Sequence, residues 1–280
     1  MASQTNAPPI AIGGVGGSGT RVVAALFRDL GYYLGDDLND AYDNLWFTLL
    51  FKRRSILLET EAKLRSLIDL FVKRMTVRER PSPEDAKQAF TAAKVDRIQH
   101  TREWLIERAR TFSDSSAELR KDNPWGWKEP NTHTVIDRLF AANLDLLYIH
   151  TVRHPIRMSL SRNQNQLENW GPIFLNRDVA IEPRLSLSFW CAAHRRILDL
   201  HRSAPRRALI VDYDKLCADP DGQYLKILKF AGADPDPNAL QRFKEYLWKP
   251  DNESWRGEVD LALFDPEDLA YVREIGYALG

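Results

Sequence analysis

Hydrophobic and polar residues alternate along this chain in two recurring patterns. Short apolar runs at 10–12, 144–152 and 208–211 are typical of strands buried within a sheet. Longer runs with apolar residues at helical spacing, such as 20–30 and 185–201, lie between them and predict amphipathic helices. This alternation predicts an α/β fold with a P-loop-type parallel sheet flanked by helices, a three-layer sandwich. We expect the whole chain to form one such domain.

Residues 52–120 depart from the alternation and predict consecutive, charge-rich helices. The sequence Ser-Pro-Glu-Asp at 82–85 marks a helix start, since it supplies a cap, a proline in the first turn and an acidic residue three positions after the cap. It predicts a helix from Pro83 to about residue 95, with another over 97–110. We interpret the block as a helical insertion or lid within the domain.

Five glycines lie within the seven residues 13–19, between the first strand and the first helix, and Gly31 is expected to end that helix. A loop this rich in glycine can turn its backbone N–H groups inward, and the N-terminus of the following helix adds partial positive charge. Residues 13–19, which we call the glycine loop, therefore predict an anion-binding site. The alternative is a turn whose glycines only let the helix pack closely on the sheet.

The glycine loop fits the nucleoside triphosphatase P-loop only in part. The spacing from Gly14 to Gly19 matches the pattern G-x-x-x-x-G-K-[ST]. However, Thr20 and Arg21 stand where that pattern has its lysine and its magnesium-binding hydroxyl. We therefore expect phosphate binding without the usual magnesium apparatus, and no metal site.

An acidic turn is predicted at the same edge of the sheet as the glycine loop. Asp36 and Asp37 follow a short apolar stretch at 32–34 that could be a strand. Parallel strands end at a common edge, where open α/β sheets bind ligands, so these carboxylates are candidates for the site. The alternative is that Asp36 or Asp37 caps the helix predicted over 43–51.

Lys128 and Glu129 follow a short aromatic stretch and are expected at that edge too. On residue type alone, the favoured interpretation is two exposed loop charges. His133 follows shortly after, and a histidine in such a position is more often a helix cap or a surface residue than a catalytic group.

Arg153 ends the strand predicted over 144–152, and Pro155 opens a helix that is expected to carry Ser161 in its second turn. An arginine at a strand end and a hydroxyl eight residues later suit a phosphate ester that is held from two sides. Taken alone, this pair is a weak indication of a phosphate-binding site.

Composition excludes several classes of protein. The chain has 39 basic and 39 acidic residues, and zero net charge argues against a generic nucleic-acid or membrane-surface binder. Cys191 and Cys217 make no disulfide framework, and no cysteine–histidine cluster has zinc spacing. No apolar stretch reaches the ~18 residues of a membrane span, and the first nine residues do not resemble a signal peptide. We expect a cytoplasmic protein.

Taken together and in this order, these motifs resemble the sulfotransferase family, which uses 3′-phosphoadenosine 5′-phosphosulfate (PAPS) as donor. The Ser-Gly-Thr at 18–20 matches the family's 5′-phosphosulfate loop, and Arg153 with Ser161 matches its 3′-phosphate motif. The late Arg-Gly at 256–257 resembles a loop that closes over the same phosphate. The Lys-Glu-Pro at 128–130 is similar to an element of bacterial and carbohydrate-type members. The resemblance covers nearly the whole chain except 52–120.

The resemblance implies a metal-independent transfer of a sulfuryl group to a hydroxyl or amine of a small-molecule, lipid or carbohydrate acceptor. It implies that separate sets of residues bind the 5′- and the 3′-phosphate of PAPS, which would distinguish PAPS from ATP. The residues that it assigns to binding PAPS, or its product adenosine 3′,5′-bisphosphate (PAP), are Gly16, Gly17, Ser18, Gly19, Thr20, Arg21, Arg153, Ser161, Arg256 and Gly257.

The resemblance also implies a general base and a cation for the leaving group. Carbohydrate- and tyrosine-type members have an acidic residue shortly after the first helix, which favours Asp37, or Asp36, as the base. Glu129 and His133 are the reserves. Cytosolic members have a lysine at the position of Gly17, so Arg21 or Lys128 would have to replace that cation here.

Two other interpretations stay open from the sequence. One is a P-loop nucleotide or small-molecule kinase, against which the absent lysine and magnesium ligand argue. The other is a non-catalytic PAP-binding protein, which Gly17 keeps open. The sequence does not identify the acceptor, and it leaves the oligomeric state open, a homodimer included.

Overall fold

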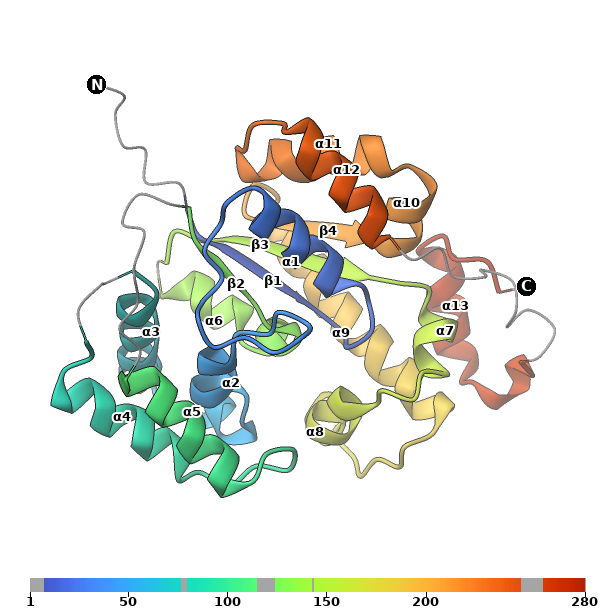
Figure 1. Ribbon diagram of the computed structural model, residues 1–280. Coiled ribbons are helices and arrows are strands. Elements are labelled where there is room, and N and C mark those ends of the chain that lie inside the picture. Colours follow the sequence, from blue (N-terminus) through green and yellow to red (C-terminus); the bar gives the residue numbers. More distant parts are fainter. Residues whose placement is uncertain (1–7, 77–79, 115–123, 143, 248–258, 280) are drawn as a thin grey trace. The chain divides into compact units, whose positions relative to one another are not determined.

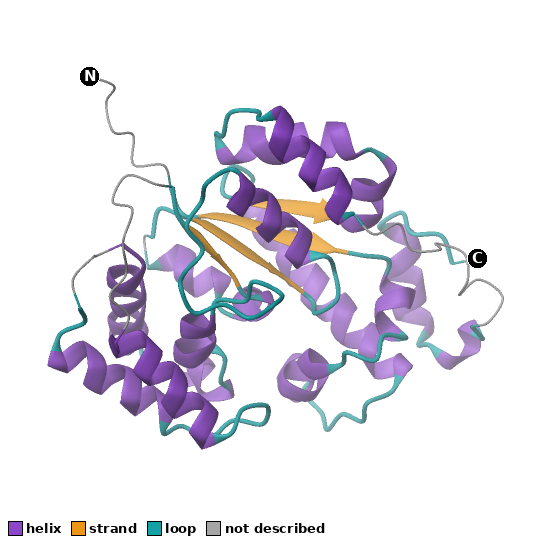
Figure 2. Ribbon diagram, viewed as in Figure 1, coloured by secondary structure: helices purple, strands orange, loops and turns teal. Residues whose placement is uncertain are grey.

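The computed structural model describes residues 8–76, 80–114, 124–142, 144–247 and 259–279. Its strands are β1 (Ile10–Gly14), β2 (Gly126–Lys128), β3 (Leu147–Val152) and β4 (Ala208–Asp212), and they form one sheet in the order β2-β1-β3-β4 (Figure 1). β1 and β2 run parallel, with Ile12 opposite Lys128. Helices flank the strands, so the predicted α/β fold is confirmed (Figure 2).

The chain packs as two compact units. The first unit comprises Met1–Gly13 and Val23–Tyr148, and the second comprises Gly14–Val22 and Ile149–Gly280. The glycine loop after Gly13 therefore belongs with the second half of the chain, although it is encoded near the beginning. Whether the two units make up the one domain expected from the sequence stays a prediction.

The first unit contains the predicted helical block. Ser82 and Asp85 form the expected capping box, in which the Asp85 N–H donates to Ser82 Oγ and the Ser82 N–H donates to the Asp85 carboxylate. The insertion or lid interpretation of this block stays a prediction. The helices of the first unit are α1 (Thr20–Asp29, from its fourth residue), α2 (Leu45–Phe51), η1 (Arg54–Leu58), α3 (Glu61–Thr76), α4 (Pro83–Ala93), α5 (Arg102–Asp114), η2 (Pro130–Thr134) and α6 (Ile136–Ala141).

Aromatic side chains form much of the first unit's core. Phe47 of α2 stacks on Trp127 of β2 with ring centroids 5.6 Å apart, and Phe71 of α3 meets Trp127 edge-on at 5.3 Å. All three rings are buried. This packing fixes two helices against β2, so it also fixes the residues that follow β2.

The predicted strand at 32–34 is reduced to one bridge. Tyr33 pairs in parallel with Trp125, but Gly35 then adopts φ +115°, which turns the chain out of the extended conformation. Asn44 caps α2, since its side chain accepts from the Phe47 N–H at 2.9 Å. The alternative in which Asp36 or Asp37 caps this helix is therefore wrong.

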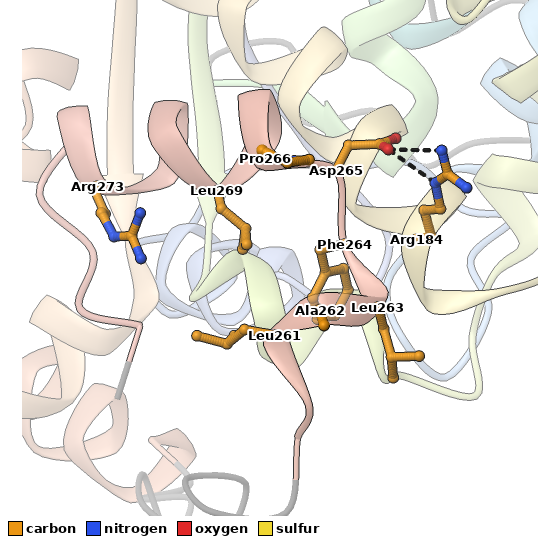
Figure 3. Close-up of a pocket in the computed structure, with 9 residues that line it drawn as sticks. All are labelled: Arg184, Leu261, Ala262, Leu263, Phe264, Asp265, Pro266, Leu269 and Arg273. Carbon is orange, nitrogen blue, oxygen red and sulfur yellow. Dashed lines mark hydrogen bonds and ion pairs between the residues drawn. The ribbon is translucent and has the colours of Figure 1, made fainter.

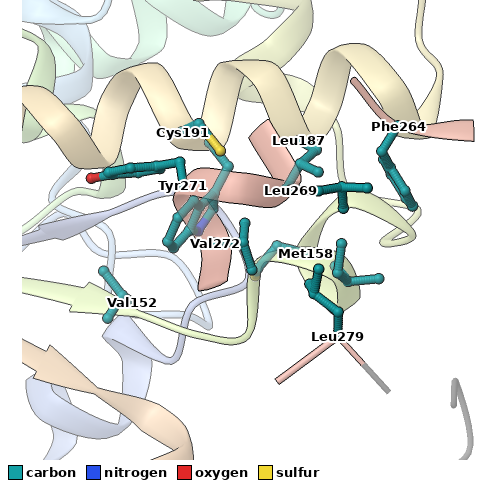
Figure 4. Packing of buried hydrophobic residues seen from close by; sticks show 11 residues of the cluster. Val152, Met158, Leu187, Cys191, Phe264, Leu269, Tyr271, Val272 and Leu279 are labelled. Carbon is teal, nitrogen blue, oxygen red and sulfur yellow. The ribbon is translucent and has the colours of Figure 1, made fainter. Parts of the chain in front are cut away.

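The second unit packs around the long helix α9. Apolar side chains from β3, α9 and the segment 264–279 form a buried cluster that includes Val152, Met158, Leu187 and Leu279 (Figure 4). Its helices are α7 (Pro155–Ser159), α8 (Asn165–Phe174), α9 (Pro183–Ser203), α10 (Tyr213–Ala218), α11 (Pro220–Ala231), α12 (Pro237–Tyr246), η3 (Leu261–Leu263) and α13 (Pro266–Glu274).

Candidate active site

The glycine loop has a backbone that only glycine adopts without strain at two positions. Gly17 has φ +91° and Gly19 has φ +94°. Close contacts add a second constraint, because a Cβ at Gly19 would lie 2.2 Å from the ring of Tyr213. A Cβ at Gly14 would lie 2.6 Å from the carbonyl oxygen of Thr151. The loop is therefore shaped by its own torsions and by the side chains beneath it.

Two side chains of the second unit form hydrogen bonds to the glycine loop. Ser18 is fully buried, and its Oγ lies 2.8 Å from the Oγ1 of Thr151 on β3. Gln166 on α8 donates from Nε2 to the Gly14 carbonyl at 3.1 Å. The sequence analysis did not single out Thr151 or Gln166. The indication available for Thr151 was a polar residue within a buried strand, one position before its last residue.

The loop leads directly into α1. Thr20 is the buried first residue of that helix, and Arg21, the second, is exposed. The N–H groups of a first helical turn lack the usual partner four residues earlier within the helix, so a helix start can offer them to an anion. Here the Val22 N–H already donates to the Gly19 carbonyl at 3.0 Å. Arg21 can add a cation from the solvent side.

The structure brings Ser161 to the glycine loop. A Cβ at Gly17 would lie 3.9 Å from Ser161 Oγ, and one at Gly16 would lie 3.5 Å from Asn163 Nδ2. Ser161 does not lie in a second helical turn, because α7 ends at Ser159. Its N–H donates to Met158 O at 3.1 Å, which closes the turn, and its Oγ accepts from the Asn163 N–H at 3.2 Å.

Arg153 leaves the end of β3 and reaches the same neighbourhood. Its guanidinium lies over the ring of Tyr213, 5.2 Å from the centroid, and the ring in turn contacts Gly19. Tyr213 therefore connects Arg153 to the glycine loop, and it is 5% exposed. Arg256 and Gly257 lie outside the described residues.

The cavities of the second unit differ in size and setting. A cavity of about 10 Å³, room for at most one water, adjoins the loop between Gly16, Met158 and Gln166. A pocket of about 640 Å³ is lined by residues 261–266 with Arg184, Leu269 and Arg273, and Arg184 pairs with Asp265 at 2.7 Å (Figure 3). No predicted phosphate-binding residue lines that larger pocket, so we do not assign it to the phosphates.

In the first unit, Lys128 lies at the end of β2 and is held by the acidic turn. Its Nζ donates to the carbonyl of Ala41 at 3.1 Å and pairs with the carboxylate of Asp43. The Asn44 N–H donates to the carbonyl of Lys128 at 2.7 Å. The side chain of Lys128 is 3% exposed, so the interpretation of an exposed loop charge is wrong.

Glu129 is buried as well. Its carboxylate accepts from the N–H of Asn131 at 2.5 Å and from Asn131 Nδ2 at 2.9 Å. Burial raises the pKa of Glu129, and the nearby Asp43 raises it further, while Lys52 and the Asn131 bonds lower it. His133, four residues on, is fully buried and belongs to η2, so it is not a surface residue.

Asp37 is tied to helix α5. Arg108 Nη1 donates to its Oδ1 at 2.7 Å, and the hydroxyl of Thr111 donates to its Oδ2. Burial raises the pKa of Asp37, partly offset by the bonds from Thr111 and Arg108. Asp36 is exposed. We use the name charged cluster for two ion-paired groups of the first unit: Asp37 with Arg108, and Asp43 with Lys128 near Glu129. The sequence did not indicate the partners Arg108, Thr111 and Asp43.

Within the described ranges, no three histidine, cysteine, aspartate or glutamate side chains come together as a metal ion would require. Of the helices that the structure describes, none combines the length and the apolar character needed to cross a bilayer.

β1, the glycine loop and α1, together with an arginine and a serine that follow β3, define an α/β protein whose loop has the form expected of an anion-binding site. The sulfotransferase family profile matches residues 8–237, so the chain belongs to the sulfotransferase family. This membership favours the sulfotransferase interpretation over the kinase interpretation. No curated protein sequence matches the chain.

Several solved structures align with this chain, and one of them does so with a TM-score above 0.5. The sulfotransferase domain of the olefin synthase from Synechococcus PCC 7002 aligns over 98% of this chain and 96% of that domain, at 19% identity and a TM-score of 0.55. STF1 from Mycobacterium tuberculosis H37Rv aligns over 86% and 72% of the two chains, at 18% identity and 0.43. Retinol dehydratase, solved with retinol and PAP, aligns over 98% of this chain and 83% of its own chain, at 13% identity and a TM-score of 0.44. The first likeness carries the fold assignment.

Proposed function

We propose that this protein transfers the sulfuryl group of PAPS to a hydroxyl or amine of a small-molecule, lipid or carbohydrate acceptor. The observation that carries the proposal is the meeting of the glycine loop with Ser161, and of Arg153 with Tyr213 beside Gly19, within one compact unit. Those are the two anion-binding motifs that a nucleotide with a 5′- and a 3′-phosphate requires.

In this proposal the loop amides from Gly16 to Thr20 hold the 5′-phosphosulfate, except that of Ser18, whose N–H donates to the Val15 carbonyl at 3.1 Å. Arg153 and Ser161 hold the 3′-phosphate. Arg256 and Gly257 would close over that phosphate. ATP has no 3′-phosphate, so it would lose this second set of contacts. The reaction itself forms a sulfur–oxygen (or sulfur–nitrogen) bond to the acceptor as the sulfur–oxygen bond to the 5′-phosphate breaks, and PAP leaves.

The base must take the proton from the acceptor as that bond forms. Asp37 is our first candidate, because burial raises its pKa in the direction that makes a carboxylate a stronger base. Two donated bonds fix its orientation, and a carboxylate has about four acceptor sites, so lone pairs remain for the acceptor proton. Asp36 is the second candidate, with Glu129 and His133 in reserve.

Gly17 replaces a lysine of the cytosolic members, and the loop geometry supplies a reason. At φ +91° a lysine would be strained, so this loop takes its shape from glycine and must find its cation elsewhere. Arg21, exposed on the first turn of α1, and Lys128 are the candidates for offsetting charge on the leaving phosphate. The Lys-Glu-Pro element at 128–130 supports a place in the bacterial or carbohydrate-type branch.

Calorimetric binding of PAP, with 5′-AMP and ATP·Mg²⁺ as comparators, tests the proposal. We expect micromolar PAP binding without metal and much weaker binding of the other two. Labelled PAPS with a panel of acceptors then tests turnover. Absence of PAP binding, or ATP binding that depends on metal, would overturn the proposal. Tight PAP binding with no transfer to any acceptor would instead favour a non-catalytic PAP-binding protein.

A further inference from the structure

Residues 277–279 pack directly on the turn that carries Arg153. The imidazole of His154, the next residue, has its Nε2 2.8 Å from the carbonyl oxygen of Ala278. The same imidazole meets the ring of Tyr277 edge-on, with centroids 5.3 Å apart. Leu279 is buried in the cluster that contains Val152, the last residue of β3 (Figure 4). The end of β3 is thus held from one side by this segment.

The hydroxyl of Tyr277 reaches the end of the neighbouring strand. It donates to Asp212 Oδ2 at 3.0 Å. The other oxygen of Asp212 caps α10, where it accepts from the Asp214 N–H at 2.9 Å. One carboxylate therefore joins Tyr277 to the first turn of α10, and that turn begins with Tyr213.

A third contact completes the connection. The backbone N–H of His154 donates to Asp214 Oδ2 at 2.8 Å, which joins the turn after β3 to α10. Arg153 lies between these attachments, with its guanidinium over the ring of Tyr213. The direction in which Arg153 leaves the sheet is therefore set by the hydrogen bonds of His154, which follows it, and by the apolar packing of Val152, which precedes it.

We propose that Tyr277 is a positioning residue for the 3′-phosphate: through Asp212 and α10 it holds Tyr213 and Arg153 in the orientation that binds this phosphate. The inference rests on the proposed function, and it adds a residue that does not itself touch the nucleotide. It should affect the two phosphates of PAP unequally, because the glycine loop is also held by the Ser18–Thr151 and Gln166–Gly14 contacts, which involve neither Tyr213 nor Tyr277. Loss of the Tyr277 hydroxyl weakens binding of the 3′-phosphate and leaves binding of the 5′-phosphate by the glycine loop in place.

The test is Tyr277→Phe in the full chain, with the binding of PAP and of 5′-AMP measured by calorimetry. Because 5′-AMP is the weaker ligand, its affinity is measured by its competition with PAP. We expect PAP affinity to fall about tenfold, the size of one lost hydrogen bond to a charged group, and AMP affinity to stay unchanged. The ratio of the two affinities is the readout, since a general loss of structure lowers both.

Tyr271→Phe is the matched control. Tyr271 lies in α13, and its hydroxyl makes a comparable bond, 2.7 Å from Nδ1 of His194. The temperature of thermal unfolding should fall in both variants, while the ratio of PAP affinity to AMP affinity should change only in Tyr277→Phe. Asp212→Asn supplies a second variant: combined with Tyr277→Phe, it should lower the ratio no further than Asp212→Asn alone.

The outcomes separate this inference from the proposed function. Wild-type protein that shows no preference for PAP over AMP overturns the proposed function. Wild-type protein that prefers PAP, with the same preference in Tyr277→Phe, overturns the role of Tyr277 alone. An equal fall of the ratio in Tyr271→Phe also overturns it, because the effect would then be one of stability.

Discussion

The glycine loop and the charged cluster are built by different means. The loop takes its shape from backbone torsions at Gly17 and Gly19 and from contacts with neutral side chains such as Tyr213. The charged cluster is held by ion pairs between distant segments: Asp37 with Arg108, 71 residues apart, and Asp43 with Lys128, 85 residues apart. Changes in the loop should therefore act through geometry, whereas changes in the cluster should act through charge and proton affinity.

Gly19→Val should have the largest effect. Its Cβ would lie 2.2 Å from the ring of Tyr213 at a φ of +94°, so both the loop and the residue beneath Arg153 must move. We expect PAP affinity to fall by more than about a hundredfold, which calorimetry would measure.

Gly31→Ala is the control for this substitution. Gly31 also has a positive φ, +84°, but nothing lies within 4 Å of a Cβ there. We expect about 1 kcal/mol of destabilisation and unchanged PAP binding. If Gly19→Val bound PAP as tightly as Gly31→Ala does, the loop would not be shaped by its contact with Tyr213.

The different construction of the two regions explains how well each could be predicted. The glycine loop is encoded within seven consecutive residues, and its flanking strand and helix are visible in the hydrophobic pattern, so its place followed from sequence. The capping box at Ser82 was likewise local and was confirmed. The short strand expected at 32–34 failed because Gly35, immediately after it, turns the chain.

The partners of the charged cluster could not be predicted in the same way. Nothing in the residues around Asp37 indicates that Arg108 and Thr111 will reach it, because a helix pairing across 71 residues leaves no local pattern. The burial of Lys128 and Glu129 was missed for the same reason: residue type favours exposure, and the aromatic packing of Trp127 overrides it.

Asp37→Asn should affect turnover and leave PAP binding unchanged. Loss of a general base typically costs about 10²- to 10⁴-fold in rate, and the phosphate contacts belong to other residues. The measurement is kcat with labelled PAPS beside the calorimetric PAP affinity. Asp36→Asn is the comparison: a larger loss of turnover there would transfer the role of base to Asp36, and equal losses of rate and affinity in Asp37→Asn would make its role structural.

Arg153→Ala should lower the affinity for PAP by about a hundredfold and leave the affinity for AMP unchanged. In the proposed function it removes a charge-assisted contact to the 3′-phosphate alone. Arg184→Ala on α9 is the control, because Arg184 pairs with Asp265 at 2.7 Å, and that ion pair is not among the contacts described above that hold the turn of Arg153. Calorimetry with both nucleotides measures the two effects. A similar loss of PAP affinity in the two variants would show that general positive charge, rather than Arg153, attracts the nucleotide.

Thr111→Val should have the smallest effect, and it tests the charged cluster by proton affinity. Burial raises the pKa of Asp37, and the Thr111 hydroxyl is a donor that lowers it. Turnover should therefore rise with pH as Asp37 ionises, along a limb whose midpoint lies above the ordinary aspartate value. In Thr111→Val that limb should move to higher pH, because the ionised form has lost a hydrogen bond.

The raised pKa of Asp37 also makes the stability of the fold depend on pH, and stability falls with rising pH where turnover rises. A carboxyl group whose pKa is raised by folding contributes stability at low pH, and that contribution is lost as pH rises through the folded pKa. Thr111→Val should therefore lose stability relative to wild type on the alkaline side of this transition. Thr91→Val, which removes an exposed helical hydroxyl on α4, should change neither profile. If the acid limb of turnover stayed in place in Thr111→Val while stability fell, Asp37 would be a structural anchor of α5 and a different group would accept the proton.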